Sequence, residues 1–112
     1  MQVQFREPKN LEEFNKLISE NKKVAIDFHA SWCGPCKIIA PKFEQMAVEF
    51  PDITYAKIDI DDVPDVAAEV GIRAMPTSMF YKDGLKWDEV VGAHTDKLGV
   101  AIQKLSSTTH NA

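Results

Sequence analysis

The sequence is poor in the features that mark several large classes of protein. It has only two cysteines in 112 residues, so no spare thiols exist to cross-link the fold, and we expect a protein of a reducing compartment. No apolar run approaches the ~18 residues that a membrane-spanning helix needs. With a net charge of −4 and no block of lysine and arginine, the chain is a poor candidate for binding nucleic acid or an anionic membrane.

The amino-terminal residues also lack the pattern of a secretory signal. The segment Met1–Glu7 has no basic stretch followed by an apolar one, so we expect a cytoplasmic protein. A chain of 112 residues is long enough for one domain that buries about two-thirds of its surface. We assign residues 1–106 to that single domain and residues 107–112 to a polar tail, and we expect a monomer.

What is present is a regular alternation of strands and helices. Apolar runs predict strands at residues 3–5, 24–28, 53–60, 77–81 and 86–91. Apolar residues at helical spacing predict helices that follow Asn10 as a cap, begin at Pro35 and at Pro64, and follow Thr95 as a cap. Asp83-Gly84 is a strong hairpin signal between the last two strands. The predicted order is βαβαβαββα, that of an α/β protein.

Both cysteines lie in the stretch Ser31-Trp32-Cys33-Gly34-Pro35-Cys36-Lys37, between a buried strand and a helix. Proline suits the first position of a helix, because its missing N–H would be unpaired there. Cys33 then lies just outside the helix and Cys36 one turn further on, with Cα atoms roughly 5–6 Å apart, which suits a disulfide. This order places the pair at the carboxyl end of a central strand, where open α/β sheets usually have their sites.

The start of the helix also distinguishes the two cysteines. The partial positive charge at a helix N-terminus favours a thiolate, so the pKa of Cys33 should be lowered. Cys36 lies further into the helix and should be the more shielded of the two. We therefore predict a redox-active pair in which Cys33 attacks and Cys36 resolves.

Three other interpretations of the cysteine pair are weaker. A structural zinc site needs four ligands, but no second cysteine pair exists and His29, His94 and His110 are scattered, so no metal site is predicted. A haem attachment would need histidine after Cys36, where Lys37 stands. A passive disulfide would contribute little stability because its loop is so short.

Several segments, in this order, resemble the thioredoxin family. They are Val24–Phe28 before the cysteine motif, Ala56–Asp59, Ile72–Thr77, the Lys82–Gly84 turn and Val91–Ala93. The resemblance covers essentially the whole chain, and Arg73-Ala74-Met75-Pro76-Thr77 is most similar to cytosolic eukaryotic members. It implies a thioredoxin fold, in which four helices flank a central mixed sheet that is mostly five-stranded.

The same resemblance implies a general protein-disulfide reductase that supports redox homeostasis and electron transport to reductive enzymes. It implies no bound cofactor, since the electrons would come from NADPH through a flavoprotein thioredoxin reductase. The expected partners are that reductase and disulfide-containing proteins such as peroxiredoxins. Two rivals stay open. One is an oxidant or isomerase of the same fold, which usually has histidine where Pro35 stands. The other is a redox-gated binding protein.

Asp27 is an acid within a strand that is predicted to be buried. Burial penalises a charged carboxylate, so desolvation should raise the pKa of Asp27. The resemblance implies that Asp27 takes and returns the proton of Cys36 through water. An alternative is a structural ion pair with Lys57, which interrupts the neighbouring strand. Both interpretations hold together if Lys57 tunes Asp27.

The resemblance also implies a substrate groove beside the cysteines. Met75-Pro76 matches the cis-proline of the family, which leaves the Met75 backbone free to pair with an extended substrate. The implied groove residues are Trp32, Ala74, Met75, Pro76, Gly92 and Ala93. The residues implied to support the site and tune its pKa values are Gly34, Pro35, Lys57 and Pro76.

His29 departs from the family pattern, which usually has an aromatic residue at this position. One hypothesis is that the imidazole titrates near neutral pH beside Asp27. The alternative is that it simply fills the space of the aromatic ring. If it titrates, His29→Phe should flatten part of the pH dependence between about pH 6 and 7.5.

Overall fold

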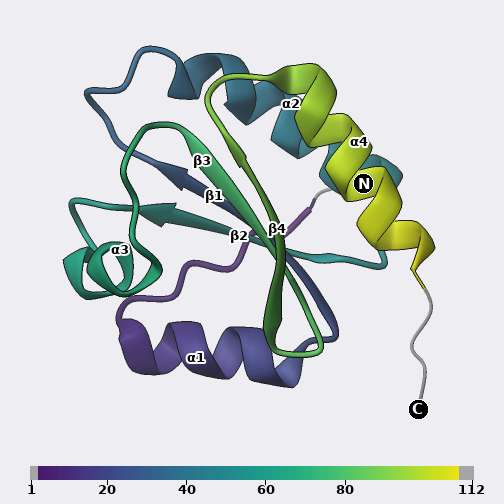
Figure 1. Ribbon diagram of the computed structural model, residues 1–112, viewed down its shortest axis with the longest axis horizontal. Helices are drawn as coiled ribbons and strands as arrows, with labels where there is room; N and C mark the ends of the chain where they lie inside the picture. The colour runs from purple at the N-terminus through teal and green to yellow at the C-terminus, as the bar shows by residue number, and fades with distance from the viewer. Residues whose placement is uncertain (1–2, 109–112) are drawn as a thin grey trace.

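Four helices and four strands follow one another in the part of the chain that the structure describes, residues 3–108 of a computed structural model (Figure 1). In chain order they are α1 (Leu11–Glu20), β1 (Lys23–His29), α2 (Cys36–Glu49), β2 (Thr54–Asp59), α3 (Pro64–Val70), β3 (Thr77–Lys82), β4 (Leu85–Val91) and α4 (Thr95–Ser107). This is the predicted α/β architecture apart from its first strand.

The strands form one mixed sheet in the order β2-β1-β3-β4. β1 pairs in parallel with β2 and antiparallel with β3, and β3 pairs antiparallel with β4. The helices α2 and α4 cover one face of the sheet, and α1 and α3 cover the other (Figure 1). β1 is therefore enclosed on both faces, as its nearly continuous apolar sequence predicts. Its carboxyl end leads directly into the cysteine motif.

The amino-terminal segment does not form the predicted fifth strand. Within the described residues it makes one isolated bridge to β2, in which the Arg6 N–H donates to the Tyr55 carbonyl and the Lys57 N–H donates to the Arg6 carbonyl, both at 2.9 Å. Packing holds the segment instead, because the Phe5 ring stacks on Phe43 with ring centroids 5.9 Å apart. The prediction of a strand at residues 3–5 is therefore wrong.

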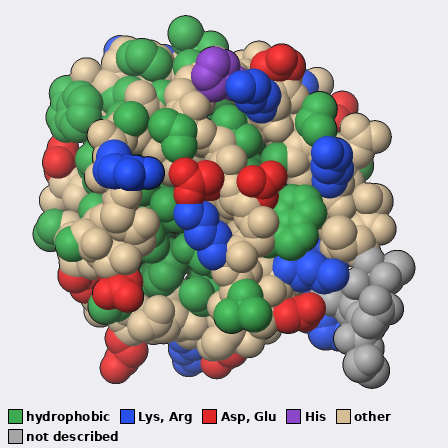
Figure 2. Space-filling view, in the orientation of Figure 1, with side chains coloured by type: hydrophobic (Ala, Val, Ile, Leu, Met, Phe, Trp, Pro, Cys, Tyr) green, Lys and Arg blue, Asp and Glu red, His purple; other side chains and the backbone are tan. Residues whose placement is uncertain are grey.

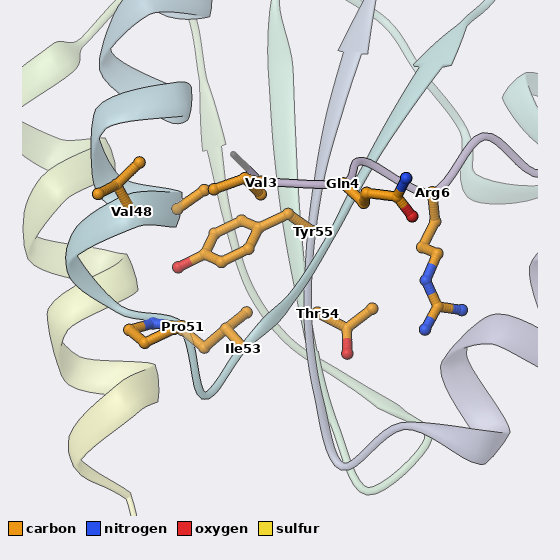
Figure 3. Close-up of a pocket in the computed structure, with 9 residues that line it drawn as sticks. Val3, Gln4, Arg6, Val48, Pro51, Ile53, Thr54 and Tyr55 are labelled. Atoms are coloured by element: carbon orange, nitrogen blue, oxygen red, sulfur yellow. The ribbon is translucent and has the colours of Figure 1, made fainter. Parts of the chain in front are cut away.

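A cavity of about 320 Å³ lies between this segment, the end of α2 and β2 (Figure 3). Val3 and Gln4 run past Tyr55 in Figure 3, while the side chain of Arg6 points away from it. Among the described residues, no backbone hydrogen bond joins residues 3–5 to β2. The lining of this cavity includes neither cysteine, so it is not part of the redox site.

Short-range signals predicted the first helix cap and the hairpin turn correctly. Asn10 Oδ1 accepts a hydrogen bond from the Glu13 N–H at 2.9 Å, and Glu13 Oε1 accepts one from the Lys9 N–H at 2.8 Å. Asp83 and Gly84 both have positive φ, 53° and 82°, as a type I′ turn requires.

Two helix starts differ from the prediction by one residue. α2 begins at Cys36, with Pro35 as its N-cap, although the backbone of Pro35 is already helical at φ −61° and ψ −23°. α4 begins at Thr95 itself, and His94 is its N-cap. Such ends depend on a single terminal hydrogen bond, which apolar spacing does not determine. α4 ends at Ser107, and positions 109–112 of the predicted tail lie outside the described residues.

A buried lysine anchors the end of α4. Lys23 Nζ donates to the backbone carbonyls of Ser106 and Thr108, both at 2.8 Å, and lies 3.5 Å from the carboxylate of Asp52. Carbonyl groups at a helix C-terminus have no partner within the helix, so an ammonium group is a suitable donor for them. The first residue of β1 is thereby joined to the carboxyl end of the described chain.

Charged side chains of both signs are interspersed on the face of the molecule shown in Figure 2. No continuous basic patch covers this face, which fits the absence of a lysine and arginine block from the sequence. Among residues 3–108, no helix has the length and apolar character needed to cross a membrane.

Candidate redox-active site

The two cysteines form a disulfide where β1 gives way to α2. Their Cα atoms are 5.4 Å apart, within the range expected from their spacing. The backbone N–H of Cys36 donates to Cys33 Sγ at 3.2 Å. Because Cys36 is the first residue of α2, the positive end of this helix faces the sulfur of Cys33. This arrangement favours negative charge on Cys33 once the disulfide is opened.

Burial alone does not distinguish the two cysteines. Cys33 is 3% exposed and Cys36 is 6% exposed, so the prediction that Cys36 is the more shielded residue is wrong for the disulfide form. The bond holds the two sulfurs side by side, and they share the cover of Ala30, Ile60 and Met75. The difference between the cysteines lies instead in the clefts that they border.

An apolar groove of about 370 Å³ reaches Cys33 but not Cys36. Its lining residues are Trp32, Cys33, Gly34, Pro35, Ile60, Ile72, Arg73, Ala74 and Met75. Trp32 is 65% exposed, and its indole Nε1 donates to Asp61 Oδ2 at 2.9 Å, which holds the ring at the rim. A disulfide presented in this groove would meet Cys33 first.

The groove contains only part of the set that was expected from the sequence. Trp32, Ala74 and Met75 line it, whereas Pro76, Gly92 and Ala93 do not. The N–H of Gly92 donates to the carbonyl of Pro76 at 2.8 Å, which joins Gly92 to the loop that precedes β3. The groove is made by the cysteine motif after β1 and by the chain segments that follow β2 and α3.

Sequence reasoning missed Ile60, Ile72 and Arg73, which also line the groove. Ile60 comes directly after β2, and the other two residues come between α3 and β3. Because β1 and β2 are parallel, their carboxyl ends lie at the same edge of the sheet. Position at that edge is the signal that could have identified Ile60.

The loop before β3 contains a cis peptide bond, between Met75 and Pro76. The hydroxyl of Thr77 donates to the carbonyl of Ala74 at 2.6 Å and closes this turn. Met75 packs against the cluster formed by the two cysteines. The turn therefore lies against the disulfide, although Met75 is 39 residues after Cys36 in the sequence.

A second cleft, of about 230 Å³, borders both cysteines and has more ionisable side chains in its lining, so we call it the polar cleft. Its lining residues are Asp27, His29, Ala30, Ser31, Cys33, Cys36, Lys37, Ala40 and Lys57. This cleft connects Cys36, which the apolar groove does not reach, to the carboxyl group of Asp27.

Asp27 is almost fully buried, with 2% of its surface exposed, and its Oδ1 has no hydrogen-bond partner among the described residues. Burial raises the pKa of Asp27 to about 6, while the charges of His29 and Lys57 lower it and that of Glu44 raises it. The upward direction is the one expected from the sequence. A carboxyl group with a pKa near neutrality can both accept and return a proton at physiological pH.

Lys57 forms its ion pair with Glu44, not with Asp27. Its Nζ donates to Glu44 Oε2 at 2.8 Å and lies 4.5 Å from the centre of the Phe5 ring. The alternative of a structural Asp27–Lys57 ion pair is therefore wrong, because a glutamate on α2 binds the ammonium instead. Lys57 affects the pKa of Asp27 only at longer range.

No group of metal ligands is assembled among residues 3–108, because no three histidine, cysteine, aspartate or glutamate side chains gather at one point there. His29 is at the carboxyl end of β1 and His94 is at the start of α4. His110 lies outside the described residues.

Comparisons with known proteins agree with this chemistry. The family model described as Thioredoxin matches residues 6–104. Thioredoxin-2 of Pyricularia oryzae is 50% identical over 101 residues, which are 90% of this chain but only 57% of that protein. Thioredoxin-1 of Schizosaccharomyces pombe is 47% identical over 91 residues, 81% of this chain and 88% of that protein.

Solved structures give the same result. One similar chain comes from a study of the thiol resolving mechanism in yeast mitochondrial 1-Cys peroxiredoxin via glutathione and thioredoxin systems. It is 39% identical to this chain, with a TM-score of 0.87, and the match covers 90% of this chain and 95% of that one. At this TM-score and coverage the likeness extends through the whole fold.

Proposed function

This chain belongs to the thioredoxin family and is a dithiol–disulfide oxidoreductase, and on that premise we propose that it is a general reductant of protein disulfides. We assign Cys33 as the attacking thiol, Cys36 as the resolving thiol and Asp27 as the group that moves the proton of Cys36. One observation carries this assignment. Of the two cysteines, only Cys33 lines the apolar groove, whereas both line the cleft that contains Asp27.

The first step takes place in the apolar groove. A substrate segment docks against Trp32 and Met75, and its backbone pairs with Met75 as a short added strand. The Cys33 thiolate, stabilised by the N–H of Cys36, attacks one substrate sulfur. A mixed disulfide forms, the substrate disulfide breaks, and the departing sulfur leaves as a thiolate that takes up a proton.

The second step uses the polar cleft. The carboxylate of Asp27 accepts the proton of Cys36, and the resulting thiolate attacks Cys33 Sγ. The Cys33–Cys36 disulfide forms as the mixed disulfide breaks, and the reduced substrate leaves. Gly34 and Pro35 form the short turn that keeps the two cysteines in reach of each other. Lys57 keeps the pKa of Asp27 from rising further.

The oxidised protein is then recharged by electrons from NADPH, delivered by a flavoprotein thioredoxin reductase, while the protein itself binds no cofactor. Its other partners are disulfide-containing proteins such as peroxiredoxins and further reductive enzymes, and it acts as a monomer in the cytoplasm. The similar chain from the peroxiredoxin study supports a partner of that class. The cytoplasmic location is supported by the small number of cysteines, which suits a reducing compartment.

The test is the reduction of insulin disulfides with NADPH and thioredoxin reductase as the source of electrons. We expect turnover by the wild type, none by Cys33→Ser, and accumulation of a mixed disulfide by Cys36→Ser. Wild-type protein that binds disulfide substrates without turning them over, while its cysteine pair still cycles with dithiothreitol, would instead support a redox-gated binding protein. Turnover by Cys33→Ser would contradict the assignment of the nucleophile.

A further inference from the structure

A row of ionisable side chains lies on the sheet face beneath α2. In the parallel register of β1 and β2, Asp27 is opposite Lys57 and His29 is opposite Asp59. Residues two apart on one strand point to the same face of the sheet. Since a strand rises by about 3.3 Å per residue, Asp27 and His29 are about 6.6 Å apart along β1. Their side chains therefore border the same space.

The polar cleft connects these two side chains with the disulfide and with solvent. Both of them line it, together with both cysteines. Asp27 is buried and His29 is partly exposed, so the imidazole borders both the cleft and solvent. The cleft, at about 230 Å³, has room for several waters, since one water occupies about 30 Å³ of liquid volume. The unpartnered Oδ1 of Asp27 is an atom that such a water would bond.

We propose that His29 is a positioning residue of the resolving step. Its imidazole takes up the proton of Asp27 and passes it to solvent, which restores the carboxylate of Asp27. The proposal rests on the proposed function, because it takes Asp27 as the acceptor of the Cys36 proton. The Cys36 proton goes to the carboxylate while the sulfur bonds to Cys33 and the mixed disulfide breaks. Asp27 then passes its proton through a water in the cleft to neutral His29. The imidazolium releases a proton to solvent, and both groups return to their starting states.

The chemistry of the two groups suits such a transfer. Imidazole is the side-chain group that ordinarily gains and loses a proton near neutral pH. Burial raises the pKa of Asp27 to about 6, so this carboxyl group can also exchange its proton close to neutral pH. Among the nearby charges, His29 has the largest effect on the Asp27 pKa, and it opposes the still larger effect of burial.

The other charged groups around this cleft are engaged elsewhere or keep one charge. From β2, Lys57 donates to Glu44 of α2, and Asp59 accepts a hydrogen bond from a backbone N–H in the following turn. Lys37 is exposed at the start of α2. Lysine and carboxylate side chains ordinarily keep one charge state near neutrality. Among the described residues that line the cleft, His29 is therefore the side chain fitted to carry a proton to solvent.

One stopped-flow experiment on the reduced protein separates the two chemical steps. The probe is the symmetrical disulfide of thionitrobenzoate, whose thiolate is coloured. Attack by Cys33 releases a first thiolate, and attack by Cys36 releases a second. We compare wild type with His29→Gln, and with His94→Gln as a matched control, because His94 does not line the cleft. His29→Phe serves as a second variant that fills the site with an aromatic ring.

We expect His29→Gln to slow the second phase by about three- to tenfold near pH 7, less than the ~100-fold loss expected when a direct base is removed. The first phase should keep its wild-type rate. Added free imidazole should restore the second phase, because it can carry the proton in place of the side chain. His29→Phe should show the same loss and the same rescue, and His94→Gln should behave as the wild type.

Two results would overturn the proposal. One is a second phase in His29→Gln with the rate and pH dependence of the wild type. The other is a second phase slowed equally at every pH and not restored by imidazole, which would indicate a structural role. Asp27→Asn, measured in parallel, separates the hypotheses. If Asp27→Asn slows the second phase and His29→Gln does not, only the role of His29 fails. If Asp27→Asn has no effect, the proposed role of Asp27 fails with it.

Discussion

The two clefts that meet at the disulfide share Cys33 but differ in their chemistry. The apolar groove has no carboxyl group in its lining and presents Trp32 and Met75 to an incoming chain. The polar cleft contains Asp27, His29 and Lys57 and extends to Cys36. In the proposed mechanism, this difference assigns docking and proton transfer to separate sides of one disulfide. Substitutions on one side should therefore change one step of the reaction and leave the other in place.

The largest effects are expected where the two clefts meet, at the cysteines. Cys33→Ser should abolish insulin reduction, because the attacking sulfur is absent. Cys36→Ser should also stop turnover, but it should accumulate a mixed disulfide, because the first step survives without the second. Mass spectrometry of the two variants after exposure to substrate distinguishes these outcomes. A mixed disulfide on Cys36 in the Cys33→Ser variant, at the wild-type rate of attack, would reverse the assignment.

Removing the acid from the polar cleft should come next in size. Asp27→Asn should slow the second stopped-flow phase by about 100-fold near neutral pH and leave the first phase intact. The ionised form is the base, so the second phase of the wild type should fall as the pH decreases through about 6, the Asp27 pKa. The variant should lack this fall. An identical pH profile in both proteins would show that another group is titrating.

The same substitution should stabilise the oxidised protein at high pH. The pKa of Asp27 is raised from 3.8 to about 6, so the folded state favours the neutral acid and loses this contribution as the pH rises through about 6. A shift of this size corresponds to about 3 kcal/mol. Asp27→Asn should gain stability by that order at about pH 8 and little at about pH 4, measured by urea unfolding. Equal gains at both pH values would contradict ionisation as the cause.

A smaller effect is expected from the rim of the apolar groove. Trp32→Ala should raise KM for protein disulfides about five- to tenfold, since an aromatic anchor contributes roughly 1–1.5 kcal/mol. It should leave the second stopped-flow phase unchanged. Asp61→Asn is the matched control, because it keeps the ring and only weakens the partner of the indole N–H. An unchanged KM in Trp32→Ala would remove this residue from the docking surface.

The smallest expected effects are shifts in pH dependence caused by the ion pair above Asp27. Lys57→Met should raise the Asp27 pKa, because a positive charge that favours the carboxylate is lost. Glu44→Gln should lower the Asp27 pKa, because a negative charge is lost. The pH at which the rate of the second phase is half-maximal should therefore be higher in Lys57→Met and lower in Glu44→Gln than in the wild type. Movement in the same direction would indicate a change in packing.

The parts of the site that depend on local geometry could be predicted from the sequence. The separation of the cysteine Cα atoms follows from three residues of turn and helix, and it was predicted within the right range. The raised pKa of Asp27 follows from its place in a strand with apolar neighbours on both sides. The hairpin at Asp83 and Gly84 follows from the ability of these residues to adopt positive φ.

The parts that depend on distant segments could not be predicted in this way. The alternation of apolar and polar residues at Val3–Phe5 is only three residues long. It does not show that Phe5 packs on Phe43 while the segment leaves most of β2 unpaired. The ion-pair partner of Lys57 could not be identified either. Glu44 lies on α2, and only the packing of this helix on the sheet brings it to Lys57 of β2. For the same reason Arg73 was missed, since its place beside Cys33 is set by the loop before β3.

The lysine beneath the end of α4 limits how the protein can be shortened or fused. A chain that ended before Thr108 would lose one carbonyl acceptor of a nearly buried ammonium group, a loss of about 1–3 kcal/mol. An affinity tag or fusion partner attached after Thr108 would leave that acceptor in place. Lys23, at the start of β1, thus determines where an engineered chain can end without weakening the contact of α4 with the sheet.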